Sequence, residues 1–124
     1  MVAVSLKKKL ALRLIDRGAA LVSDDYTVVR RSKGRLLASA PATIAGRIEV
    51  RGLGILASPP LTEAPVALFV TLDEAVPRMP ERPLPSRRLA GVAVPMIALA
   101  GLEASAPIKV ELALRALEDE ELFS

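Results

Sequence analysis

The sequence predicts an α/β fold, with a mixed sheet flanked by helices in a single domain spanning residues 1–124. Three observations predict it. The N-terminal part has the order strand, helix, strand, which favours a crossover connection and a partly parallel sheet. Short apolar runs separated by turn residues follow, and a second amphipathic segment closes the chain. A chain of 124 residues has room for a modest core.

Composition excludes several classes of function. The chain has no cysteine and no histidine, which rules out disulfides, Cys/His zinc sites and a Ser-His-Asp relay within it. Aromatic residues are only 2% of the sequence and the net charge is a mild +3, so we expect no nucleic-acid partner. The apolar N-terminal run is interrupted by charges and lacks a signal-peptide pattern, so we expect a cytoplasmic protein without membrane contact.

The elements are expected in the following order. Residues 2–4 form a short strand or a frayed start, and residues 6–17 form a helix with Ser5 as N-cap and Gly18 after its end. The remaining strands are expected at 19–22, 26–30, 35–38, 66–72, 89–94 and 96–100, the last two separated at Pro95, and a final helix at 108–117. Residues 32–34 are a turn, and 57–65 and 77–88 are proline-rich loops.

The stretch 48–55 is expected to run as strand, turn and strand. Its apolar residues, which should face a core, are Ile48, Val50, Leu53 and Ile55. Glu49 and Arg51 point the other way, beside Gly52 and Gly54, which permit a positive φ or a close ligand approach. A carboxylate and a guanidinium there suit a metal ion and a phosphate. A solvent-facing pair beside an ordinary turn explains the same pattern.

Asp24 and Asp25 follow the predicted strand 19–22. Ligands of open α/β sheets collect at the carboxyl ends of strands, so one carboxylate can approach a metal while the other accepts a proton. A plain turn is the alternative, since aspartate favours turns. Glu49 would be a third carboxylate on a neighbouring strand.

Two groups of cations are less specific. Lys7, Lys8 and Lys9 occupy the first turn of the first predicted helix, where they either hold an anion or form a solvated basic end. The arginines of residues 77–88 either clamp a phosphoryl group or keep an exposed loop soluble.

Together these residues resemble the catalytic domain of HPr kinase/phosphorylase, in the short form found in alphaproteobacteria. The segment 10–18 resembles the helix after the family's phosphate loop, and 21–25 resembles its double-aspartate motif. Residues 48–57 resemble its signature I-E-[IV]-R-G-L-G-I, while 95–99 and 104–109 are also similar to the short forms. The resemblance therefore covers nearly the whole chain and implies a fold like that of the P-loop kinases.

The resemblance implies Mg²⁺-dependent phosphoryl transfer from ATP, or pyrophosphate, to a serine of the phosphocarrier protein HPr, and its reversal. Asp25 would accept the proton in the kinase direction and donate it in the reverse direction, and Asp24 would support it. Glu49 and Asp24 would bind Mg²⁺. Arg78 would be the catalytic arginine. The nucleotide would contact Lys7, Arg51, Gly52 and Gly54. The family also implies a homo-oligomer.

The chain departs from the family at the phosphate loop. The family's form is G-x-x-G-x-G-K-[ST], with its lysine at Lys7, but residues 1–6 contain no glycine and Lys8 replaces the Ser/Thr. Backbone N–H groups wrap a phosphate only where side chains leave room. We therefore expect weakened nucleotide binding. Alternatives are a catalytically silent HPr-binding module and a generic anion-binding domain using Lys7 to Lys9.

Overall fold

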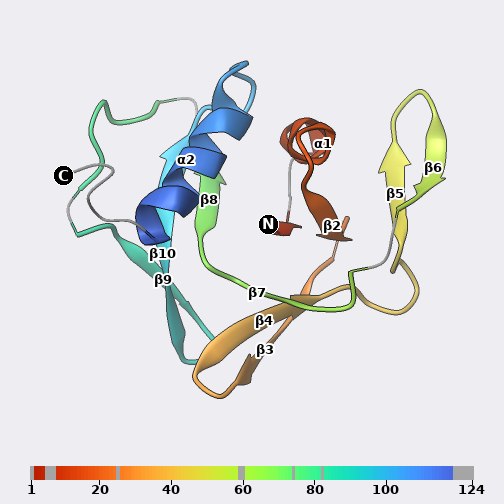
Figure 1. Cartoon of the computed structure of the whole chain (residues 1–124), viewed down its shortest axis with the longest axis horizontal. Helices are drawn as coiled ribbons and strands as arrows, with labels where there is room; N and C mark the ends of the chain where they lie inside the picture. Colours follow the sequence, from red (N-terminus) through yellow and green to blue (C-terminus); the bar gives the residue numbers. More distant parts are fainter. Residues whose placement is uncertain are drawn as a thin grey trace.

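The computed structural model describes residues 2–4, 8–24, 26–58, 61–73, 75–81 and 83–118. It contains two helices and ten strands among these residues (Figure 1). Their order is β1 (Val2–Val4), α1 (Lys8–Asp16), β2 (Ala20–Ser23), β3 (Val28–Ser32), β4 (Arg35–Ser39), β5 (Arg47–Val50), β6 (Gly54–Ala57), β7 (Ala64–Pro65), β8 (Phe69–Leu72), β9 (Ser86–Leu89), β10 (Val92–Leu99) and α2 (Ala106–Glu118).

The strands form four small sheets rather than one continuous sheet. β1 and β2 are parallel and joined through α1, as the strand–helix–strand order predicts. β10 lies between β8, which runs parallel to it, and β9, which runs antiparallel. β3, β4 and β7 form an antiparallel sheet, and β5 pairs with β6 in a separate hairpin. The mixed pairing with flanking helices confirms the predicted α/β class.

Helix α1 ends as its sequence predicts. Gly18 has φ +101°, a conformation that favours glycine, directly after the last helical turn. The amide of Ala19 donates to the carbonyl of Leu14 at 3.0 Å, and that of Gly18 donates to Ile15 at 2.9 Å. These two bonds form the Schellman motif, which satisfies carbonyls left open at a helix end. The predicted N-cap, Ser5, lies outside the described residues.

The main core lies between the two helices and the β8–β10 pair. Its buried members are Leu10, Leu14, Ala19, Leu99, Ala106 and Val110, with Val70, Leu72, Ile97 and Leu114 packed against them. A smaller cluster places Val22 of β2 against Ala38 and Ala64 of the β3–β4–β7 sheet. Strand β2 is therefore anchored along its length, which fixes the position of its carboxyl end.

Two hairpins turn in the same way. The loops Lys33-Gly34 and Ala90-Gly91 each have two residues with positive φ, between 48° and 76°. Two-residue loops of this kind match the right-handed twist of the strands they join. Ala90 adopts this conformation without being glycine, which costs roughly 1 kcal/mol or more.

Several sequence-based boundaries were wrong. The predicted loop 77–88 ends in β9, and the predicted strand 89–94 contains the Ala90-Gly91 turn. Residues 66–72 are not one buried strand, since only Phe69–Leu72 pairs. Pro95 does not split the last strands, because β10 runs through it from Val92 to Leu99. Pro95 lies where β10 changes partners, after its pairing with β9 and before its pairing with β8 at Met96. Its missing N–H is tolerated there because pairing ends at that position.

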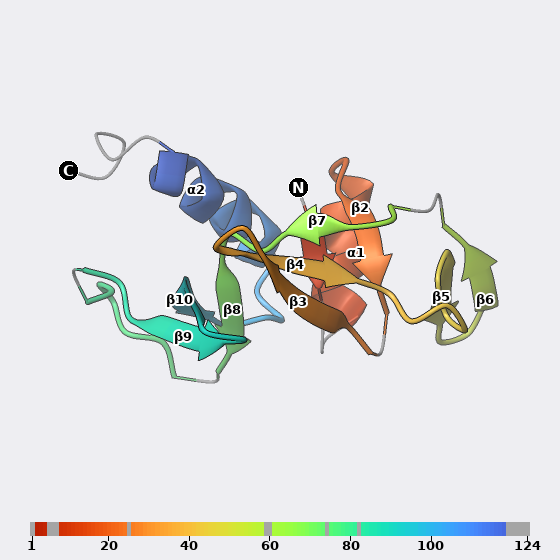
Figure 2. The same ribbon diagram turned by 90° about the horizontal axis from the view of Figure 1, so that it is seen from below.

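The β5–β6 hairpin lies on one side of the molecule (Figures 1 and 2). The β8–β9–β10 sheet and the 75–81 segment lie on the other. Helix α1 lies between them. Neither described helix is long and apolar enough to cross a membrane.

Candidate functional site

The carboxyl end of β2 is a buried, hydrogen-bonded turn. Ser23 is 2% exposed, and its hydroxyl donates to the carbonyl of Tyr26, across the position of Asp25. Asp24 is 9% exposed. Burying a carboxylate is expensive unless it accepts hydrogen bonds, so this position needs specific partners.

One of those partners comes from the signature hairpin. The Oδ2 atom of Asp24 accepts a hydrogen bond from the backbone N–H of Glu49 at 3.0 Å. This contact joins the end of β2 to β5, although 25 residues separate the two in sequence. Two of the three predicted acids are therefore neighbours, through the side chain of Asp24 and the backbone of Glu49.

The β5–β6 hairpin is closed by a short turn. The amide of Leu53 donates to the carbonyl of Val50 at 3.0 Å, and Gly52 and Gly54 have φ +91° and +111°. Apart from the glycine and its two chain neighbours, no described atom lies within 4 Å of the point where a Cβ would stand on either glycine. Both glycines therefore serve the backbone conformation, and the space beside them is open among the described residues. Arg51 lies exposed in the same turn.

The expected inward face of this hairpin was wrong in part. Ile48 is 6% exposed, as predicted, but Leu53 and Ile55 are 75% and 69% exposed. Among the described residues, β5 contacts the rest of the chain through Ile48 and the Asp24 hydrogen bond, whereas the residues of β6 are exposed. The alternating pattern correctly indicated a hairpin, but it could not show that the side chains of β6 are exposed.

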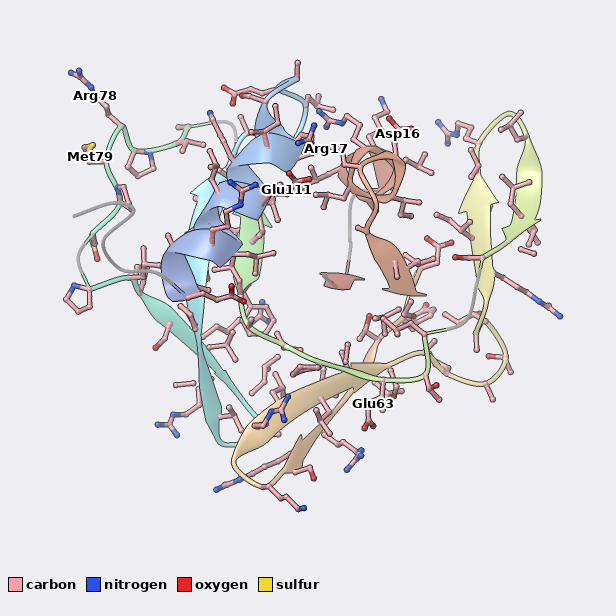
Figure 3. All side chains as sticks on the ribbon, in the orientation of Figure 1. Asp16, Arg17, Glu63, Arg78, Met79 and Glu111 are labelled. Carbon is pink, nitrogen blue, oxygen red and sulfur yellow. The ribbon has the colours of Figure 1, made fainter. Side chains whose placement is uncertain are left out.

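Of the predicted residues that the structure describes, Arg78 lies apart from this site. Asp25 and Lys7 lie outside the described residues. Arg78 is exposed at the outer edge of the 75–81 segment, on the side of the molecule away from β5–β6 (Figure 3). Its catalytic role stays a prediction.

The described part of the chain holds no group of three acidic, histidine or cysteine residues placed to bind a metal. Asp24 and Glu49 together still offer the right chemistry, since Mg²⁺ prefers oxygen ligands and usually takes one or two carboxylates while keeping several waters. The donor set therefore fits a magnesium ion in kind, with Asp25 outside the described residues.

The resolved pKa changes lie elsewhere, between the two helices. Arg17 Nε donates to Glu111 Oε1 at 2.7 Å and its NH2 donates to Oε2 at 2.9 Å (Figure 3). This two-point hydrogen bond from Arg17 lowers the pKa of the Glu111 carboxyl, and the same contact raises the pKa of Arg17. The pair supports helix packing and does not belong to the candidate site.

The sequence analysis missed two residues, Ser23 and Arg13, that position the turn after β2 and helix α1. The side chain of Ser23 closes the turn before Tyr26, and a serine directly before two aspartates was the available signal. The guanidinium of Arg13 donates to the carbonyls of Gly101 and Glu103, joining α1 to the loop before α2. No local pattern indicates a contact across 88 to 90 residues.

Comparison with known proteins gives these features a context. The family model of the HPr Serine kinase C-terminal domain matches residues 5–60. HPr kinase/phosphorylase of Clostridium tetani (strain Massachusetts / E88) is 46% identical over 55 residues, covering 44% of this chain and 18% of that protein. The corresponding protein of Clostridium botulinum (strain Eklund 17B / Type B) is 46% identical over 50 residues, covering 40% and 16%. The chain thus matches less than a fifth of the length of these relatives.

A solved structure extends the likeness beyond the matched segment. The Hpr(Ser) kinase/phosphatase from Coxiella burnetii superposes with a TM-score of 0.75 and 26% identity, covering 98% of this chain and 87% of that one. The matched segment 5–60 contains the β2 turn and the whole β5–β6 hairpin. The chain is thus similar to HPr kinase/phosphorylase in sequence over residues 5–60 and in fold over nearly its whole length, which supports an HPr kinase-like domain.

Proposed function

We propose that this chain is a serine kinase/phosphorylase domain that exchanges a phosphoryl group between ATP, or pyrophosphate, and a serine of HPr. The observation that carries the proposal is the 3.0 Å hydrogen bond from the Glu49 amide to Asp24. It brings the aspartate turn and the signature hairpin together, inside the segment that matches the family. Both elements were singled out separately in the sequence as carriers of this chemistry.

Asp24 has the environment of a positioning group. Its carboxylate is buried and accepts an amide N–H, which holds the end of β2 against β5. Asp25, the next residue, would accept the proton of the serine hydroxyl while the serine oxygen bonds to the transferred phosphorus and the P–O bond to the leaving ADP breaks, or to phosphate when pyrophosphate is the donor. In the reverse reaction it would return the proton to the serine oxygen as the serine P–O bond breaks and the phosphoryl group passes to phosphate or ADP. A fixed Asp24 would orient Asp25, since positioning supplies much of the catalysis in phosphoryl transfer.

Glu49 and Asp24 would hold Mg²⁺. The ion, when bound, supplies neutralisation of the charge on the phosphoryl oxygens. Arg51, beside the open turn of Gly52 and Gly54, would contact the phosphates, and the two glycines would let the backbone approach them. Lys7 would contribute a further positive charge, and Arg78 would act on the transferred group.

A catalytically silent HPr-binding module is the second candidate, and one specific observation favours it. The first glycine of the chain is Gly18, at the end of α1, so no glycine-rich loop precedes that helix. Backbone amides then have less room to wrap a phosphate. We therefore expect weak nucleotide affinity. The exposed Leu53 and Ile55 support the accompanying expectation of a homo-oligomer.

Transfer of radiolabelled phosphate from γ-labelled ATP to purified HPr, with Mg²⁺, tests the proposal. We expect serine-linked label on HPr, strongly reduced in Asp25→Asn because the proton acceptor is lost. Glu118→Gln, at the far end of α2, serves as the control. A version carrying a glycine-bearing loop before Lys9 separates a poor phosphate loop from a wrong assignment. If neither version labels HPr, the kinase proposal is refuted.

Calorimetry distinguishes the two candidates. Heat from HPr binding without heat from Mg-ATP supports the silent module, whereas Mg-ATP binding at micromolar concentration rules it out. Binding of neither ligand contradicts both candidates. The fold assignment does not depend on the result.

A further inference from the structure

Two hairpins outside the candidate site carry basic residues and no acidic ones. Residues 28–39 and 86–99, which form β3–β4 and β9–β10, contain six of the 17 basic residues and none of the 14 acidic ones. The whole chain carries only +3, so the rest of the molecule is net acidic. Such separation of charge on a small domain creates a local field that a mixed surface lacks.

A side chain of the β3–β4 hairpin reaches the turn of the β9–β10 hairpin. Arg88 Nη1 donates to the carbonyl of Gly91 at 3.0 Å. Arg31 Nη1 reaches the same glycine from β3, and lies 3.1 Å from the point where a Cβ of Gly91 would stand. Two guanidinium groups from different sheets are therefore held at one turn, where they repel each other unless an anion lies between them.

Among the described residues, one of these six cations has an acidic partner. Arg30 is bound by Glu63 at 2.9 Å. The others are exposed and make no salt bridge to a described carboxylate; they are Arg31, Lys33, Arg35, Arg87 and Arg88. We call these five residues the two-hairpin basic surface. Arg87 is further oriented by the ring of Phe69, whose centroid lies 5.5 Å from its Cζ atom.

We propose that the two-hairpin basic surface docks an acidic segment of a partner protein. Four of its five cations are arginines, whose planar guanidinium groups pair with carboxylates at two points. The contacts of Arg88 and Arg87 fix both side chains before binding, which reduces the entropy lost on association. An extended peptide with several Asp or Glu residues matches the charge of this surface.

A nucleic acid fits the surface less well. Stacking of bases needs exposed aromatic rings, but Phe69 is half-buried beneath Arg87. Tyr26, the only tyrosine, precedes β3 and lies at the end of that strand away from the Lys33 turn. The surface also lies away from the β5–β6 hairpin (Figures 1 and 2). Docking there would leave the candidate site accessible, so the two can be tested separately.

Fluorescence anisotropy with a short labelled peptide of alternating glutamate and serine tests the proposal on the full chain at about 0.15 M salt, where the screening length is about 8 Å. We expect Arg31→Glu/Arg88→Glu to weaken binding by about tenfold or more. Lys33→Glu/Arg35→Glu should act in the same direction, and because both residues are exposed at the turn it should leave the circular dichroism spectrum unchanged. Arg47→Glu/Arg115→Glu changes the net charge equally at distant exposed positions.

The matched variants make the result decisive. If the control pair weakens peptide binding as much as the surface pairs do, only net charge matters and the proposal is refuted. It is also refuted if a short DNA duplex binds more tightly than the peptide under the same conditions. Should Arg31→Glu/Arg88→Glu fail to fold, Lys33→Glu/Arg35→Glu alone decides. Kinase activity enters none of these measurements.

Discussion

The α1–α2 side and the β5–β6 hairpin use similar apolar residues in opposite ways. Leu14 and Val110 are 5% and 6% exposed in the main core, whereas Leu53 and Ile55 on the hairpin are 75% and 69% exposed. The core residues are selected by packing, since each faces neighbours that exclude water. Packing within the described chain does not explain why Leu53 and Ile55 are apolar, because both side chains are exposed.

This difference matters because the hairpin belongs to the segment that matches the family, while α2 does not. Most of its side chains are not fixed by the core, and Ile48 is its buried anchor. A two-stranded hairpin is only marginally stable alone. Its position therefore depends on a few contacts, above all the one with Asp24.

The largest effect is expected from Leu14→Ala. It leaves a cavity among α1, α2 and β10, and should lower the free energy of unfolding by about 2–5 kcal/mol in urea titration. Leu53→Ala removes a side chain of the same size from an exposed turn. It should change the free energy of unfolding by less than about 0.5 kcal/mol. Equal losses would mean that the hairpin is packed as tightly as the core.

Asp24→Ala should have the next largest effect. It leaves the Glu49 amide without its acceptor, at a cost of about 1–3 kcal/mol. Hydrogen exchange should show faster exchange at the Glu49 amide while Leu14 stays protected. Asp24→Asn keeps a carbonyl acceptor and should restore part of the protection. Unchanged exchange at Glu49 in both variants would contradict the contact.

Alanine at two positive-φ glycines compares local strain in the two regions. Gly18→Ala and Gly52→Ala each force φ near +101° or +91° on a side chain, with no clash at either Cβ. Each should cost about 1–2 kcal/mol. We expect Gly18→Ala to lower the thermal midpoint of the whole domain, and Gly52→Ala to speed exchange only in the hairpin. A global shift from both would show that the hairpin unfolds together with the core.

The smallest effect is expected at the helix pair. Because Arg17 lowers the pKa of Glu111 in the folded chain, the pair stabilises the fold above the unfolded pKa near 4.5. This contribution is lost as the pH falls through the lower folded pKa. The thermal midpoint of Glu111→Gln should therefore lie slightly below that of the parent at neutral pH and approach it below pH 4.5. A difference that persists in strong acid would contradict the ion pair. The effect is small because the pair is exposed.

Local signals predicted much of the fold. Gly18 marked the end of α1 and Lys33-Gly34 marked a hairpin turn, because positive φ is a property that glycine reveals in the sequence. The path of β10 through Pro95 could not be predicted. A proline is tolerated there because the strand changes its pairing partner at that residue. The separation into four sheets is likewise a tertiary outcome.

The candidate site was also predicted only in part, because local sequence signals do not show tertiary contacts. The family resemblance and the strand-end position both indicated Asp24 and Glu49, and the structure brings them together. The contact runs through a backbone amide, which no side-chain pattern encodes. The exposure of Leu53 and Ile55 depends on what lies beyond β6, and alternation along a strand carries no information about that.

The amide contact also sets what position 49 tolerates. Asp24 binds the main chain there, so every residue type except proline offers the same N–H. The bond consequently gives no preference for an acid at this position, and architecture alone would accept alanine or threonine equally well. This hydrogen bond therefore fixes where residue 49 lies. It does not explain why that residue is a glutamate.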